Sequence, residues 1–330
     1  MLRSPNAGLC QSGGLSLNVL TSEELKQIHQ ATLEVLEHTG IYVQCPKARS
    51  VFAEAGAVIT AKGVVKIPPL VVEEAIRSAP STLVLRARNP QNDFVLGGKR
   101  VAFTNFGEAV NINDPETGEY RESIKSDLEK IGRVVDYLDS IAVFEKPAAA
   151  SDKPMEVIPM HNFEAMINNC TKHIFMGSMS GEMTERILEL SDAVVEEVFP
   201  DVEDPSDYRL VSFITCPVSP LRLVTDSCEI IMAAAKNKAV INVLSMAMAG
   251  GSTSIHLAGT LVSHNAEVLA GITLAQLTRQ GAPVVYGSST TALDLKTSSA
   301  VVGSPELAMI SAGVAALANY YGLPSWVAGG

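Results

Sequence analysis

Hydrophobic and polar positions follow two different patterns along this chain, and the change comes near residue 140. Beyond it, short apolar runs alternate with longer stretches of helical periodicity. The apolar runs are Ile141–Phe144, His173–Met176, Leu210–Thr215, Val240–Ser245, Val284–Tyr286 and Ser325–Val327. The helical stretches include Met183–Val198, Arg222–Ala235, Leu257–Thr278 and Glu306–Tyr320. A strict strand–helix–strand order predicts a parallel sheet with right-handed crossovers.

Two Ser-Pro pairs, Ser219-Pro220 and Ser304-Pro305, are typical of helix starts, with serine as the cap and proline in the first turn. Two architectures fit this order: a doubly wound sheet and a (β/α)8 barrel. No GxGxxG follows the first strand, which weakens the dinucleotide-binding version. Six consecutive strand–helix units without a topological break favour the barrel. A barrel of this type has eight strands, and the sixth expected strand ends beside Gly330. The first and sixth strands would be open edges, so we expect the sequence to be incomplete and the product to be insoluble or oligomeric.

Residues 1–140 show a mixed pattern. A Gly/Ser/Asn-rich arm over residues 1–20 precedes a helix that Thr21 and Glu24 open as a capping box and Gly40 ends. A second helix is expected over Pro68–Ser78, followed by strands at Thr82–Arg88, Phe94–Leu96 and Arg100–Phe106, a tight hairpin at Gly97-Gly98, and a turn at Asp114–Gly118. We therefore predict an α+β region over 1–140 and an incomplete barrel domain over 141–330.

Composition narrows the function classes. The chain is 47% hydrophobic and 18% charged, with a mean hydropathy of +0.20, which is typical of a globular protein with a large core. A net charge of −11 without a basic cluster longer than Lys99-Arg100 argues against nucleic-acid binding. The apolar stretch Leu257–Leu277 carries His264, Asn265 and Glu267, so we expect a buried helix and no membrane association.

The five cysteines show no CxxC spacing, and no leader pattern opens the chain. These features favour reduced cysteines in a cytoplasmic protein and predict no metal site.

The second half of the chain resembles the trimethylamine:corrinoid methyltransferase family, of the type that contains pyrrolysine. The segments that carry the resemblance are Asn242–Met248, Gly250–Ser252, Leu257–Val262, His264–Leu269, Tyr286–Thr291 with Asp294 and Leu295, Val302–Leu307 and Tyr321–Gly330. Leu20–Leu25 and Cys216–Leu221 resemble the family more weakly. In pyrrolysine-containing members a Val-Ala-Gly-rich segment like the one ending at Gly330 precedes pyrrolysine, whose UAG codon is ordinarily read as stop. The resemblance therefore implies that the catalytic residue follows Gly330.

The resemblance also implies the reaction. A methyl group would pass from trimethylamine to the Co(I) corrinoid of a cognate corrinoid protein, with no cofactor bound directly by this chain. A homo-oligomer is expected at full length, whereas the chain as it stands is expected to be inactive. Two alternatives stay open. One is a relative without pyrrolysine that demethylates a quaternary amine such as glycine betaine, and the other is an inactive fragment that binds the corrinoid protein.

Candidate substrate-binding residues lie where the expected strands end. Tyr286 could offer its ring to a methylated ammonium group, or it could simply pack in the barrel. Small or polar neighbours at the strand ends could leave room for the amine and the corrin ring; the candidates are Met246, Ser288, Ser289, Gly329 and Gly330. Trp326 is expected to pack outward against the helices, because Ser325 and Val327 would face the barrel axis.

Other candidates are open to structural readings. Asp294 could act as an acid or base or could be a loop carboxylate. His264 and Glu267, spaced i, i+3, could line the mouth, although a buried hydrogen-bonded pair is the favoured interpretation. Gly250 and Gly251 could cradle a phosphate or form a flexible loop.

Overall fold

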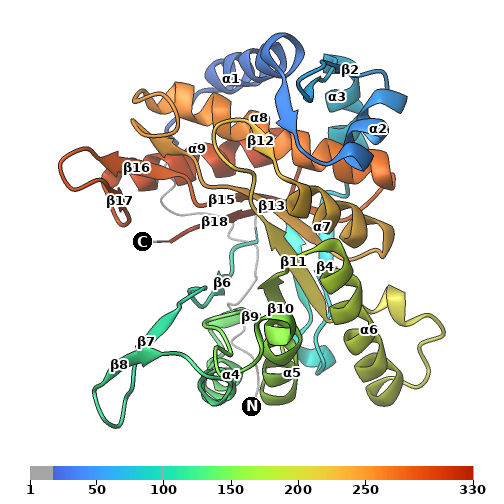
Figure 1. Ribbon diagram of the computed structural model, residues 1–330, viewed down its shortest axis with the longest axis vertical. Coiled ribbons are helices and arrows are strands. Elements are labelled where there is room, and N and C mark those ends of the chain that lie inside the picture. The colour runs from blue at the N-terminus through green and yellow to red at the C-terminus, as the bar shows by residue number, and fades with distance from the viewer. Residues whose placement is uncertain (1–17, 99, 330) are drawn as a thin grey trace. The chain divides into compact units, whose positions relative to one another are not determined.

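The computed structural model describes residues 18–98 and 100–329 (Figure 1). The described residues form two compact units: residues 83–214 with 237–239 in unit 1, and 18–82, 215–236 and 240–329 in unit 2. Each unit takes residues from both sides of position 140, so the predicted boundary, which rests on element type, stays a prediction. Gly330, Cys10, Lys99 and most of the expected arm at 1–20 lie outside the described residues.

Unit 1 is built on parallel strands in the order β6-β9-β10-β11. Its strands are β4 (Thr82–Leu85), β5 (Phe94–Gly97), β6 (Phe103–Thr104), β7 (Asn111–Asn113), β8 (Tyr120–Glu122), β9 (Ile141–Glu145), β10 (His173–Gly177) and β11 (Val211–Thr215). Its helices are α4 (Lys125–Tyr137), α5 (Ile158–Asn169) and α6 (Gly181–Val198), with 3-10 turns at Pro90–Asn92, Met155–Val157 and Pro205–Asp207. Helix α5 was not predicted, because its buried face includes the polar Asn162, which weakens the apolar pattern.

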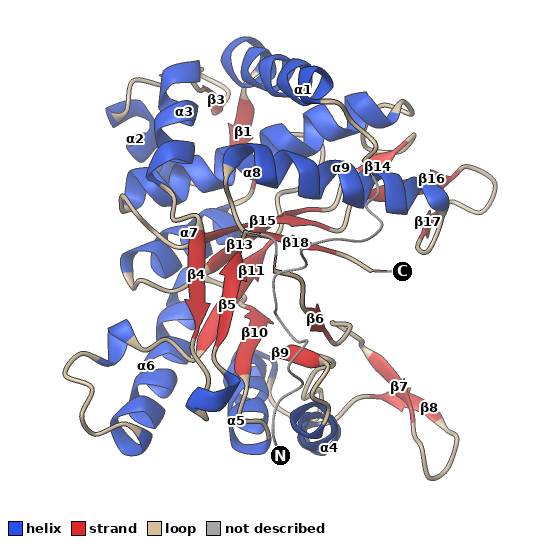
Figure 2. Ribbon diagram, turned by 180° about the vertical axis from the view of Figure 1, so that it is seen from behind, coloured by secondary structure: helices blue, strands red, loops and turns tan. Residues whose placement is uncertain are grey.

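The first part of unit 1 corrects one prediction. The hairpin at Gly97-Gly98 is wrong, because β5 pairs with β4 while β6 runs parallel to β9, with Phe103 beside Ile141. Both glycines have positive φ and do form a turn, but the chain beyond it meets a strand that is distant in sequence. Strand β9 is therefore not the open edge that was expected. The predicted turn at Asp114–Gly118 is confirmed between β7 and β8, which extend away from α4 (Figure 2).

Unit 2 contains the parallel strands β13-β15-β18 and most of the helices. Its strands are β1 (Ile41–Val43), β2 (Val58–Ile59), β3 (Val64–Lys66), β12 (Arg222–Leu223), β13 (Ile241–Ser245), β14 (Met248–Ala249), β15 (Val284–Ser288), β16 (Thr291–Asp294), β17 (Ser299–Val301) and β18 (Ser325–Val327). Its helices are α1 (Ser22–Glu34) with a π turn at Val35–Thr39, α2 (Pro46–Glu54), α3 (Pro69–Ser78), α7 (Thr225–Lys236), α8 (Leu257–Thr278) and α9 (Pro305–Tyr321).

Helix α8 is the centre of unit 2. It packs on β13 and β15 on one side and against α1, α3 and α7 on the others (Figure 1). Fifteen of its residues are buried, including His264, Asn265 and Glu267, which confirms the prediction of a buried helix. Among the described residues, no helix is both long enough and apolar enough to cross a membrane.

The predicted helix starts are confirmed at two of three places. Thr21 and Glu24 form the capping box of α1, and the Ser304 hydroxyl accepts from the Leu307 N–H with Pro305 in the first turn of α9. The third is wrong: Ser219-Pro220 does not open a helix, because the next residues form β12 beside β1 and α7 starts at Thr225. The Ser219 hydroxyl donates to Glu267 instead, so a tertiary partner takes the group that was expected to cap a helix.

Candidate functional site

The carboxyl edge of the unit 2 strands is organised by Glu267. This side chain on α8 is fully buried. The hydroxyl of Ser245, at the end of β13, donates to its Oε2 atom over 2.6 Å, and the hydroxyl of Ser219 donates to the same atom over 2.7 Å. The Leu221 N–H donates to Oε1 over 2.9 Å. Burial raises the pKa of Glu267, while these three donors act in the opposite direction. Glu267 therefore fastens the loop after β11 to the end of β13.

His264 lies on the same helix but serves a different strand. Its Nδ1 atom is 3.1 Å from the hydroxyl of Thr290, which follows β15. Its Nε2 atom is buried and has no partner among the described residues. Burial lowers the pKa of His264 to about 3, so the ring is neutral at physiological pH. His264 and Glu267 are both buried, as expected, but the predicted bond between them is wrong because each bonds to a different strand end.

Tyr286 lies on the helix side of β15 and is fully buried. Its hydroxyl donates to Asn265 Oδ1 over 2.7 Å, and its ring meets that of His264 edge-on at 5.4 Å between centroids. The Asn265 amide nitrogen in turn donates to the hydroxyls of Thr32 and Tyr321. Tyr286 thus belongs to a polar network between strand and helices, and its role in substrate binding stays a prediction.

The other predicted substrate residues gather at the strand ends, as the sequence indicated. Ser288 is buried and its hydroxyl accepts from the Thr290 N–H, while Ser289 is half-buried and its N–H donates to the Ser245 carbonyl. Met246 is 54% exposed, and Gly329 is exposed just beyond β18. Their roles stay predictions, whereas Gly330 cannot be placed because it lies outside the described residues.

Asp294 and the two glycines after β14 sit in turns. The Asp294 carboxylate accepts from the Lys296 N–H and the Thr297 hydroxyl, and these bonds lower its pKa. Gly250 has φ +81° and donates to the Thr253 carbonyl, and Gly251 donates to Met248. Both N–H groups are therefore used in hydrogen bonds within the turn, which lies before the start of α8. The structure favours the loop interpretation for Gly250 and Gly251 over a phosphate cradle.

The carboxyl edge of the unit 1 strands carries a glutamate that the sequence analysis did not single out. Glu145 ends β9 and is only 6% exposed. Its Oε2 atom accepts from the Thr104 hydroxyl of β6 over 3.0 Å. Burial raises the pKa of Glu145 to about 7, and the negative charge of Glu108 adds to this effect. Glu108 itself pairs with Lys146 Nζ at 3.1 Å.

A sequence signal for Glu145 did exist. It directly follows the predicted apolar run Ile141–Phe144, and charged groups at the carboxyl end of a barrel strand are typical of active sites. Burial is the main cause of its raised pKa, and Thr104, whose hydrogen bond lowers the pKa, reaches Glu145 only through the unpredicted pairing of β6 with β9. Among the described residues, no group of three His, Cys, Asp or Glu side chains is arranged to hold a metal ion.

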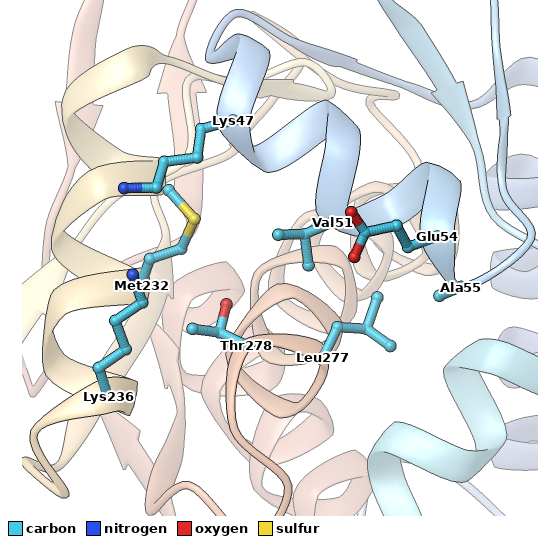
Figure 3. Close-up of a pocket in the computed structure, with 8 residues that line it drawn as sticks. All are labelled: Lys47, Val51, Glu54, Ala55, Met232, Lys236, Leu277 and Thr278. Atoms are coloured by element: carbon cyan, nitrogen blue, oxygen red, sulfur yellow. The ribbon is translucent and has the colours of Figure 1, made fainter.

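A cavity of about 410 Å³ lies among the helices of unit 2 (Figure 3). It is lined by Lys47, Val51, Glu54, Ala55, Met232, Lys236, Leu277 and Thr278. The last residues of α7 and α8 belong to it, and these helices lead into the amino ends of β13 and β15. It therefore lies at the opposite end of the strands from Ser245 and Ser288, away from the edge where barrel enzymes hold their reacting groups.

Comparison of the sequence with known proteins shows similarity to methyltransferases that act on methylated amines. A family described as trimethylamine methyltransferase (MTTB) matches residues 9–330. A trimethylamine methyltransferase of Desulfitobacterium hafniense is 49% identical over 325 residues, which is 98% of this chain and 65% of that protein. A trimethylamine methyltransferase of Methanosarcina mazei is 43% identical over 98% of this chain and 66% of its own length. A glycine betaine methyltransferase of Desulfitobacterium hafniense is 33% identical over 95% of this chain and 64% of its own. The chain thus spans slightly less than two thirds of the length of these relatives.

Among solved structures, the monomethylamine methyltransferase (MtmB) of Methanosarcina barkeri matches with a TM-score of 0.58. The match covers 94% of this chain and 62% of that one, at 12% sequence identity. At this identity the likeness concerns the fold alone. Together with the parallel strand–helix order in both units, it confirms the predicted α/β fold of the barrel type.

Proposed function

We propose that this chain, which belongs to the trimethylamine methyltransferase family, provides strand-edge residues of an enzyme that moves a methyl group from trimethylamine to the Co(I) corrinoid of a partner protein. The observation that carries the proposal is the 49% identity, over 98% of the chain, with a protein named for trimethylamine methyl transfer. In this proposal the corrinoid is a substrate that another protein carries. It is not a cofactor bound by this chain.

The chemical difficulty lies in the leaving group. A neutral amine does not release a methyl group readily, because an amide anion would have to leave. A pyrrolysine after Gly330, as the resemblance implies, would supply an electrophile that makes the amine nitrogen quaternary. The remaining tasks, which are to hold the amine and to manage its proton, fall to side chains such as those described above.

Glu145 is suited to take up the proton that trimethylamine carries in neutral water. Trimethylamine is largely protonated in neutral water, and a protonated nitrogen has no lone pair with which to attack an electrophile. A carboxylate with a pKa of about 7 can take that proton and can release it again. The same proton completes the product, because the nitrogen that has lost its methyl group needs one proton to leave as dimethylamine. We assign Glu145 this exchange, with Thr104 orienting its carboxyl group.

Glu267 supports the reaction without taking part in it. Its three donors are at the end of β13 and in the loop after β11, so it fixes the strand edge. Because its carboxyl group holds the strand end and the loop in place through these donors, Glu267 is a positioning residue.

The second candidate substrate is a quaternary amine, favoured by the relative that is named glycine betaine methyltransferase. A quaternary nitrogen carries no proton and would need no base before it reacts. The near-neutral pKa of Glu145 therefore favours the tertiary amine.

The test uses a protein of the relatives' full length, produced with pyrrolysine, together with a corrinoid protein. We expect methylation of the corrinoid with trimethylamine, at a rate that rises as the pH passes through about 7 and Glu145 loses its proton. Glu145→Gln should lower the rate by about 10²- to 10⁴-fold, whereas the exposed Glu119→Gln should leave it unchanged. Faster turnover of glycine betaine than of trimethylamine would instead establish the second candidate.

A further inference from the structure

The strands β13, β15 and β18 of unit 2 have one face covered by helices. Val243 packs on α8, since a Cβ added at Gly271 would lie 2.6 Å from its Cγ1. Ser245 and Tyr286 bond to Glu267 and Asn265 of the same helix. Side chains alternate along a strand, so the residues between these positions point to the opposite face.

Trp326 lies on that opposite face. In the parallel register, Leu244 is beside Gly287 and Gly287 is beside Trp326, and register partners point to the same side of the sheet. The three residues therefore form one row that faces away from α8. The prediction that Trp326 packs outward against the helices is wrong. The strand alternation was right, but only the contacts of α8 reveal which set of side chains it covers.

The row has two features of a binding surface. Gly287 has no side chain, and the Asn242 amide fills the space over it, between Leu244 and Trp326. A Cβ there would lie 2.1 Å from Asn242 Oδ1, so no larger residue fits without movement. Asn242 stands on the same face, one level deeper along β13, and is fully buried. Neither its Oδ1 nor its Nδ2 atom has a partner among the described residues. A buried amide without partners costs free energy, which a bound polar ligand would recover.

We infer that the indole ring of Trp326, together with the buried amide of Asn242 that lies over Gly287, forms the surface that recognises the methylated ammonium group of the substrate. Tryptophan offers the strongest π face for a quaternary or tertiary ammonium ion. Trp326 is half-buried and lies near the carboxyl end of β18. The ring of Tyr286, by contrast, is fully buried against α8. The net charge of −11 favours the approach of a cation. This inference rests on the proposed function, because it takes the substrate class from it.

The emission that Trp326→Phe removes isolates the fluorescence of Trp326. We would titrate a protein of the relatives' full length with trimethylammonium chloride at constant ionic strength, and in parallel with tert-butanol, a neutral molecule of similar shape. We expect a saturable change in emission with the cation and a much weaker response to the alcohol. An equal response to both, or no saturable response to the cation, would overturn the inference.

Substitutions test the same site by calorimetric binding of trimethylammonium. Trp326→Phe keeps an aromatic face and should retain most of the affinity, whereas Trp326→Leu should weaken binding by about 3- to 30-fold. Tyr320→Leu removes a half-exposed aromatic ring elsewhere in unit 2 and should have no effect. Thermal melts establish that the variants fold, and if Trp326→Leu does not, the fluorescence contrast decides.

The two proposals fail in different ways. Trp326-dependent binding of the ammonium ion without any methyl transfer by the full-length protein would reject the proposed function and leave the binding surface in place. If the full-length protein transfers the methyl group and Trp326→Leu changes neither the rate nor the Michaelis constant, the function is supported and the binding surface is rejected.

Discussion

Glu145 and Glu267 are both buried glutamates near the carboxyl ends of parallel strands, yet their surroundings differ. In unit 2, Glu267 accepts from two hydroxyls and one backbone N–H, and no negative charge is among the causes that shift its pKa. In unit 1, Glu145 accepts from one hydroxyl and feels the charge of Glu108. The glutamate in unit 2 is thus held by three donors, whereas the one in unit 1 has a single donor, a nearby negative charge and a pKa of about 7. Position in the fold does not settle a glutamate's role, because the number and charge of its partners do.

The largest expected effect concerns Glu267. Glu267→Ala removes the acceptor of three buried donors, so the free energy of unfolding should fall by about 3–5 kcal/mol. Glu267→Gln should cost less, about 1–3 kcal/mol, because an amide keeps one acceptor oxygen but turns a donor toward the hydroxyls. Urea unfolding measures both, with the exposed Glu74→Gln as a control. A change of less than 1 kcal/mol in Glu267→Ala would show that the network does not hold the strand edge.

The next effect concerns Glu145 and is opposite in sign. Folding raises its pKa from 4.5 to about 7, so the folded protein binds this proton more tightly than the unfolded chain does. The stability contributed by this residue is present below pH 4.5 and is lost as the pH rises to about 7. Glu145→Gln should therefore be more stable than the parent at pH 8, by up to about 3 kcal/mol, and the gain should shrink toward pH 5. Thermal melts across this range measure it, and a gain independent of pH would rule out the titration.

The smallest expected effect is a shift in the pKa of Glu145, which tests how much its neighbours contribute to that pKa. Glu108→Gln should lower the pKa of Glu145 because it removes a negative charge, and Thr104→Val should raise it because it removes a donor to the carboxylate. Carbon-detected NMR of the side-chain carboxyl group follows both shifts. If both variants leave the pKa of Glu145 in place, burial alone accounts for it.

The sequence by itself determined the order of the predicted barrel strands and the bounds of several elements. Period-two and helical patterns placed β18 at Ser325–Val327 and α8 at Leu257–Thr278, as the structure has them. The capping box at Thr21 was also readable, because its two partners are three residues apart. These features depend on neighbours along the chain.

Only the tertiary structure decided which partners distant residues meet. The pairing of β6 with β9 gave Glu145 its neighbour Thr104. The contacts of α8 put Tyr286 on the face of the strands that α8 covers, and Trp326 on the face that points away from α8. A periodic pattern shows that a strand has two faces, but which face a helix covers, and which charges approach a buried carboxylate, depends on contacts between segments far apart in sequence.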